Sequence, residues 1–328
     1  MSTTDYPPPL IIPPRVLPHK QTFILLHGRG SSGEKFGPVL LDTPLSQPAD
    51  NNSNGSPASN NPPAQTSHTT QTLATTFPHA RFIFPTAPRR RATLYRHART
   101  RQWFDSWEVN TPDAAVEREE LQGPGLRETT AYLHGLLAAE IARVPGGAAN
   151  VVLGGLSQGC AESLVAVLLW EGSPLGAVVG MCGWLPFAGG LVEEAGAGVD
   201  DGREVGEEEE EENDLFERED DFFDREEDGG EEKDPVVRAR QWLRGELDLP
   251  GGDARDDSSA FREVPVFLGH GVEDDRVSVV LGRNAAACFG TLGVQTLCWK
   301  EYRDLAHWYS GDMLRDIVAF LRNLELSR

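Results

Sequence analysis

The pentapeptide Gly155-Leu156-Ser157-Gln158-Gly159 decides the fold of this chain. It follows an apolar run at 151–153 that is typical of a buried strand, and it precedes an apolar segment at 160–169 that is typical of a helix. Small residues two positions before and after a serine permit a tight strand-to-helix turn, which lifts the hydroxyl above the sheet. The first amides of the new helix then face whatever the serine attacks. The sequence therefore predicts that Ser157 is a nucleophile.

A serine hydroxyl requires a base, and the base requires an orienting carboxylate. After this kind of turn the acid and then the histidine follow along the chain. Downstream of Ser157 the sequence has two histidines, His270 and His307. His270 ends an apolar strand at 264–269, and Asp274 lies four residues beyond it; His307 follows a second strand at 294–299. We therefore expect Asp274 and His307 to complete a catalytic triad with Ser157.

The strand at 22–26 ends in a His-Gly-x-Gly turn at 27–30, which suggests an oxyanion hole. In a fold of this kind the loop after that strand donates one backbone N–H, and the residue after the nucleophile donates the other. The expected donors are the backbone N–H groups of Arg29 and Gln158. Such donors face the position where negative charge develops on the reacting carbonyl oxygen.

The same loop supports an alternative function. Gly28, Gly30 and Gly33 match the G-x-G-x-x-G pattern of dinucleotide-binding oxidoreductases. That pattern also requires an acidic residue about 20 positions later, at the end of a second strand. The segment 47–55 is too rich in Asn, Pro and Ser to form a core strand, which disfavours this alternative. An inactive acidic interaction scaffold is a third alternative, disfavoured because no catalytic element is missing.

Further motifs surround these residues in a characteristic order. They are Phe82-Ile83-Phe84-Pro85-Thr86-Ala87-Pro88, Trp103-Phe104-Asp105, Gly183-Trp184-Leu185-Pro186, His270-Gly271 with Asp274, and Leu305-Ala306-His307. With them the chain resembles the acyl-protein thioesterase and phospholipase/carboxylesterase family of α/β-hydrolases, in a fungal-like version. The resemblance implies hydrolysis of carboxylic esters or acyl thioesters through an acyl-enzyme, without a cofactor or metal. It also selects Asp274 rather than Asp275 as the acid. The implied substrates are acylated proteins or small-molecule and lipid esters.

The 328 residues are expected to form one α/β domain with two long disordered insertions. Strands and helices alternate along the chain, which predicts a mostly parallel sheet covered by helices on both faces. The first insertion, 43–76, is rich in Ser, Thr, Asn and Pro; the second, 191–262, is acidic. Between 200 and 234 the chain has 21 acidic and 4 basic residues, against a net charge of −21 for the whole chain. This segment is interpreted as a solvated arm, with docking to a basic protein partner as the alternative.

Several function classes are disfavoured by composition. The acidic balance argues against nucleic-acid binding and against attraction to anionic lipid. No apolar run reaches the length of a membrane span, so stable membrane insertion is not expected. The four cysteines have neither metal-site spacing nor the density of a disulfide framework. The N-terminal segment lacks a signal-peptide core, and we expect a soluble, cytoplasmic enzyme.

Overall fold

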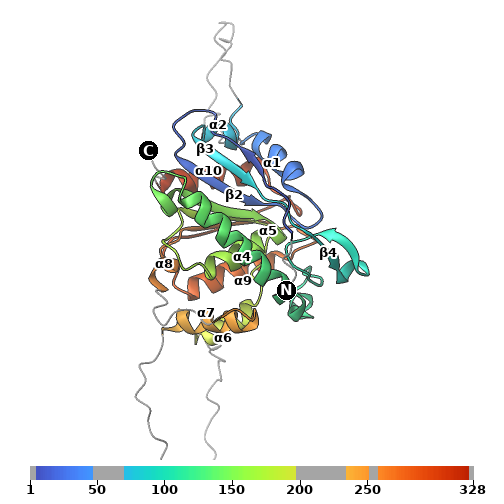
Figure 1. The fold of residues 1–328 in the computed structure, drawn as a ribbon. Helices are drawn as coiled ribbons and strands as arrows, with labels where there is room; N and C mark the ends of the chain where they lie inside the picture. Colours follow the sequence, from blue (N-terminus) through green and yellow to red (C-terminus); the bar gives the residue numbers. More distant parts are fainter. Residues whose placement is uncertain (1–4, 47–69, 197–233, 251–257, 325–328) are drawn as a thin grey trace, which may run out of the picture.

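The computed structural model describes residues 5–46, 70–196, 234–250 and 258–324 (Figure 1). Its centre is a seven-stranded sheet with the order β1-β3-β2-β6-β7-β8-β9. All neighbouring strands are parallel except β1, which pairs antiparallel with β3. The strands are β1 (Leu10–Ile12), β2 (Gln21–Leu26), β3 (Ala80–Phe84), β6 (Val151–Leu156), β7 (Ala177–Met181), β8 (Val266–Gly271) and β9 (Leu297–Tyr302).

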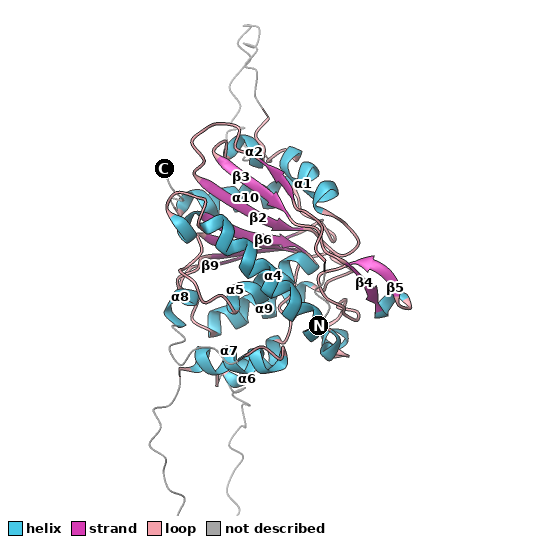
Figure 2. Ribbon diagram, in the orientation of Figure 1, coloured by secondary structure: helices cyan, strands magenta, loops and turns pink. Residues whose placement is uncertain are grey.

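Helices cover both faces of the sheet (Figure 2). One face packs on α4 (Gly123–Ile141), α5 (Gln158–Leu168) and α9 (Val279–Thr291), and the other on α1 (Gly33–Asp42), α2 (Leu73–Thr76) and α10 (Gly311–Asn323). Successive side chains of a strand point to opposite faces, so Ile24 and Leu26 join the first core while Phe23 and Leu25 join the second. The central strands β6 and β7 are apolar throughout because both of their faces are buried, whereas the edge strand β9 is partly exposed and carries Lys300 and Glu301. The predicted α/β-hydrolase architecture is confirmed.

A small two-stranded hairpin projects from one end of the sheet (Figure 1). It pairs β4 (Arg89–Ala92) with β5 (Ala98–Arg101), and a short 3-10 turn, η1 (Thr93–Tyr95), joins them. The Asp105 carboxylate accepts hydrogen bonds from the Thr93 backbone N–H and hydroxyl. This contact ties the turn of the hairpin to the segment that follows β5.

Parts of the two predicted insertions are folded, so the prediction of disorder is wrong there. Within 43–76, Pro44 bridges to Thr72, α2 forms, and the side chains of Leu45 and Leu73 are buried. Within 191–262 lie most of α6 (Ala188–Glu194), the whole of α7 (Pro235–Glu246) and α8 (Ser258–Arg262). These ends bury apolar side chains that the overall polar composition of the segments concealed. The rest of each range, including the acidic residues up to 233, lies outside the described residues.

Candidate active site

Ser157 occupies the sharp turn between β6 and α5. Its backbone has φ 58° and ψ −123°, a strained conformation for a residue with a side chain. The turn passes so close to β2 that a Cβ atom at Gly159 would lie 2.5 Å from the Leu26 carbonyl oxygen. The Ser157 N–H donates to the Met181 carbonyl at 2.8 Å, which ties the turn to the next strand. Glycine at 159 and a hydrogen-bonded backbone together hold the strained serine in place.

The structure brings together the three residues predicted as a triad. His307 Nε2 lies 2.9 Å from Ser157 Oγ, and His307 Nδ1 lies 2.8 Å from Asp274 Oδ2. Asp274 follows β8 and His307 follows β9, so both approach Ser157 from the carboxyl ends of neighbouring strands. Asp275 is exposed and lies on the cavity wall. The hydrogen-bond chain from serine through imidazole to carboxylate therefore runs through Asp274.

The surroundings of Asp274 favour its ionised form. Burial alone would raise the pKa of this carboxyl group, but hydrogen bonds from His270, His307 and the Val277 N–H outweigh it and lower the pKa. Asp274 Oδ1 accepts from the backbone N–H groups of Arg276 and Val277, each at 2.9 Å. The acid is thus an anion at neutral pH, held by a turn of its own loop.

The predicted oxyanion donors lie beside Ser157. A Cβ atom at Gly28 would be 3.3 Å from the Ser157 Cβ, so the loop after β2 runs directly past the serine. Gln158 is the first residue of α5, where a backbone N–H has no acceptor within its own helix. Arg29 and Gln158 both line the same cavity as Ser157 and His307. The Arg29 guanidinium turns away to donate to Ser106 and stacks over the Tyr95 ring, with 5.9 Å between Cζ and the ring centroid.

A network of buried side chains fixes the loop that carries Arg29. The sequence analysis assigned no role to this network. The Gln158 side chain accepts from the Trp103 N–H at 3.0 Å and donates to the Phe104 carbonyl at 2.8 Å. The Trp103 indole in turn donates to the His27 carbonyl at 2.7 Å. These bonds link segments that are far apart in the sequence. The Trp-Phe-Asp motif was a signal for them, but its contacts were not readable from spacing.

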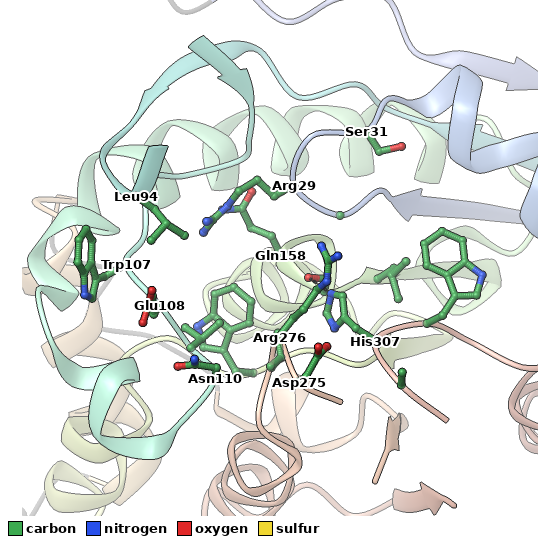
Figure 3. A pocket seen from close by; sticks show the side chains of 18 of the residues that line it. Arg29, Ser31, Leu94, Trp107, Glu108, Asn110, Gln158, Asp275, Arg276 and His307 are labelled. Atoms are coloured by element: carbon green, nitrogen blue, oxygen red, sulfur yellow. Dashed lines mark hydrogen bonds between the residues drawn. The ribbon is translucent and has the colours of Figure 1, made fainter. Parts of the chain in front are cut away.

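A cavity of about 660 Å³ opens at Ser157 (Figure 3). Figure 3 shows Arg29, Gln158, Arg276 and His307 gathered around it, with Leu94, Trp107 and Glu108 toward one end. The hairpin contributes Leu94 and Tyr95 through η1. The walls include five large aromatic side chains: Phe36, Tyr95, Trp107, Trp184 and Trp308. Aromatic walls around a few polar groups are typical of a site for a mainly apolar ligand.

The alternative roles drawn from the sequence find little support in the geometry. The Gly28–Gly33 loop lies against Ser157, and β3 is followed by Pro85 and Thr86, where a dinucleotide site needs an acid. Among the described residues, Cys182, His270 and Asp274 form a group with metal-ligand spacing. Their atoms are engaged, because Cys182 donates to Trp308 O, His270 lies 2.9 Å from Val277 O and Asp274 binds His307. We assign no metal to them.

Comparisons with known proteins agree with this geometry. The model of the Phospholipase/Carboxylesterase family matches residues 63–197, a range that includes Ser157. "Acyl-protein thioesterase 1" of Yarrowia lipolytica is 32% identical over 182 residues, covering 55% of this chain and 64% of that protein, less than two thirds of its length. "Acyl-protein thioesterase 1" of Gibberella zeae is 23% identical over 317 residues, covering 96% and 94%.

The similarity extends to solved structures. The crystal structure of Zea mays acyl-protein thioesterase 2 superposes with a TM-score of 0.59 at 19% identity, covering 97% of this chain and 99% of that chain. At that identity the likeness establishes the fold. No helix in the described part of the chain has both the length and the apolar character to cross a membrane. The comparisons together show that the chain has the α/β-hydrolase fold and that residues 63–197 are similar to the Phospholipase/Carboxylesterase family.

Proposed function

We propose that this chain is a serine hydrolase that cleaves carboxylic esters or acyl thioesters through an acyl-enzyme. The observation that carries the proposal is the continuous chain Ser157 Oγ–His307 Nε2 (2.9 Å) and His307 Nδ1–Asp274 Oδ2 (2.8 Å) at the floor of an aromatic cavity. The same constellation performs nucleophilic acyl transfer on unrelated folds, so its geometry is informative independently of the fold.

In this mechanism His307 removes the proton from Ser157 as the hydroxyl oxygen attacks the substrate carbonyl carbon. The tetrahedral oxyanion accepts hydrogen bonds from the backbone N–H groups of Arg29 and Gln158. His307 then returns the proton to the departing alkoxide or thiolate, which leaves the acyl group on Ser157. A water molecule, deprotonated by His307, then attacks the acyl carbon; the bond between that carbon and Ser157 Oγ breaks, His307 returns the proton to Ser157 Oγ, and the acid is released. Asp274 keeps the imidazole in the required tautomer and stabilises its protonated form.

The cavity supports an apolar acyl or alcohol group as the bound portion. Tyr95 and Trp308 are 49% and 47% exposed, so large aromatic surface remains open at the mouth. Burial of apolar surface against such walls contributes roughly 25 cal/mol per Å². An acylated protein or a lipid or small-molecule ester fits this chemistry, and two relatives with the printed name acyl-protein thioesterase make the former the leading substrate class. We place the activity in the cytoplasm as part of the proposal.

The test uses purified wild type and Ser157→Ala. A fluorophosphonate probe is expected to label wild type covalently and to leave the variant unlabelled. A series of p-nitrophenyl esters of increasing chain length, run beside an acyl thioester, then measures kcat/KM for each class. Turnover by wild type alone supports the proposal. Equal labelling or equal turnover by both proteins would remove Ser157 from the nucleophile role.

A further inference from the structure

We propose that His270 is a positioning residue that holds the Asp274 loop, so that the Asp274 carboxylate stays aimed at His307. This inference rests on the proposed hydrolase function, and it places a second histidine behind the acid of the proposed triad. His270 is the penultimate residue of β8, and the acid loop begins just beyond it. Its side chain is 1% exposed. It does not touch Ser157's cavity, so it acts only through Asp274.

The contacts of His270 close the acid loop. His270 Nε2 lies 2.9 Å from the Val277 carbonyl oxygen and 3.1 Å from Asp274 Oδ2. That carboxylate oxygen is the same one that lies 2.8 Å from His307 Nδ1. Val277 donates its N–H to Asp274 Oδ1 while its carbonyl faces His270. The imidazole therefore fastens both the turn that carries the carboxylate and the oxygen that binds the catalytic base.

The location of the proton on His270 follows from its partners. Nε2 faces two oxygen acceptors, so it carries the hydrogen. Nδ1 is buried and has no hydrogen-bond partner among the residues that the structure describes. A second proton on the ring would have no acceptor there. His270 therefore donates toward Asp274, so that the carboxylate has a second imidazole donor besides His307.

Two other titratable groups face this pair from neighbouring strands. Burial raises the pKa of the Cys182 thiol, which follows β7, to about 12. On β9, the hydrogen bond from Arg283 lowers the pKa of Glu301 to about 2. Cys182 thus stays neutral and Glu301 stays anionic across the neutral pH range. A change in the pH profile around neutrality then reports on His307 coupled to Asp274.

Loss of the His270 N–H has a predictable electrostatic consequence. The N–H stabilises negative charge on Asp274 Oδ2, so its removal makes that oxygen more basic. The electrostatic interaction between Asp274 and the His307 imidazole then changes. The carboxylate also becomes free to rotate away from His307. Loss of this alignment lowers kcat, and the altered charge on Asp274 changes the pH dependence of activity.

The test compares His270→Leu with His270→Gln. Leucine removes the donor, whereas the glutamine amide has two N–H bonds and can serve both Asp274 Oδ2 and Val277 O. His134→Leu is the matched control, because it removes an imidazole contact of 2.8 Å to the Ala166 carbonyl on helices away from the cavity. Ester hydrolysis is measured between about pH 5 and pH 9, a range that spans the ordinary histidine pKa. The rates are divided by the concentration of active sites, which is determined by titration with a fluorophosphonate. A melting curve of each variant shows whether it is folded.

His270→Leu is expected to lower kcat by about 10- to 100-fold with little change in KM, the size known for outer partners of metal-binding histidines. The midpoint of its acid limb is expected to differ from that of wild type. Glutamine is expected to restore both values, and His134→Leu to keep the wild-type profile. A wild-type acid limb in His270→Leu, or equal losses in the leucine and glutamine variants, would overturn the inference.

Two arms keep the outcome decisive. If His270→Leu does not fold, His270→Asn replaces it, because the shorter amide does not reach Asp274, and equality of Asn and Gln variants contradicts the proposal. If Ser157→Ala retains turnover, the proposed function fails on its own. The inference is then decided by NMR titration of the His307 imidazole. The spectra of wild type and His270→Gln are compared with those of His270→Leu, or of His270→Asn if His270→Leu does not fold. An unchanged titration would reject it.

Discussion

At the scale of single residues, the two adjacent acids after β8 show how local geometry assigns different roles to identical side chains. Asp274 is 9% exposed and accepts two backbone N–H groups, whereas Asp275 is exposed on the cavity wall. The order of serine, acid and histidine was predictable from the sequence. The choice between neighbours was not predictable from spacing alone, because it depends on which carboxylate the turn folds under. Family resemblance supplied it.

Substitution of the two acids tests this assignment. Asp274→Asn is expected to lower kcat by about 10⁴-fold, because the amide favours the wrong imidazole tautomer. Asp275→Asn, the matched control one residue away, is expected to change kcat by only a few-fold. Steady-state hydrolysis of one short ester by both variants, at equal concentrations of folded protein, provides the comparison. If Asp275→Asn were the more damaging change, the acid of the triad would have to be reassigned.

At the scale of elements, the buried central strands were predictable from the sequence, whereas helix α1 and the bounds of the edge strand β9 were not. The strands predicted at 22–26 and 264–269 are observed as β2 and β8 with shifts of one or two residues. Helix α1 was missed because glycine and Pro38 interrupt its pattern; a Cβ at Gly37 would lie 2.6 Å from the Phe84 ring. The last strand, expected at 294–299, is observed at Leu297–Tyr302. Tertiary packing, absent from local patterns, decides such elements.

The loop after β2 depends on a histidine that must stay neutral. His27 Nε2 accepts the Ala87 N–H at 3.1 Å, and Nδ1 lies 2.7 Å from the Gly28 carbonyl oxygen. Burial lowers the pKa of His27 to about 4. Protonation would replace the acceptor at Nε2 by a donor facing another donor. The loop that carries Arg29 is therefore sensitive to acid.

This sensitivity predicts a pH-dependent stability. In the unfolded chain His27 binds a proton near its ordinary pKa of about 6.5, whereas in the folded chain it does so only near the lowered pKa of about 4. The unfolded state thus binds more protons between these values, and stability falls as pH decreases through that window, by up to about 3 kcal/mol. Urea unfolding of wild type and His27→Asn at several pH values measures it. A pH slope that is the same in both proteins would refute this origin.

At the scale of the whole molecule, the acidic charge is concentrated in one segment of the chain. The segment 200–234 holds 21 acidic and 4 basic residues, and its positions up to 233 lie outside the described residues. Composition singled out this segment, but it did not locate the ends of the helices on either side, α6 and α7. The ends pack together: Phe187 meets Trp242 edge to face at 6.2 Å between ring centroids, and Arg238 Nε donates to the Glu194 carbonyl at 3.1 Å.

Because α6 and α7 are in contact, a short Gly/Ser linker can replace residues 200–233. We expect melting within a few degrees of wild type and unchanged turnover of a small neutral ester, since the two helices bury their own apolar side chains. Asp234 has to be kept, because it caps α7 through the Val236 N–H and lies 2.7 Å from Arg262. A second replacement extended to residue 234 is the control, with an expected further loss of about 1 kcal/mol. Failure of the shorter replacement to fold would mean that the acidic segment is a structural part of the domain, and loss of turnover with intact folding would assign it to the active site.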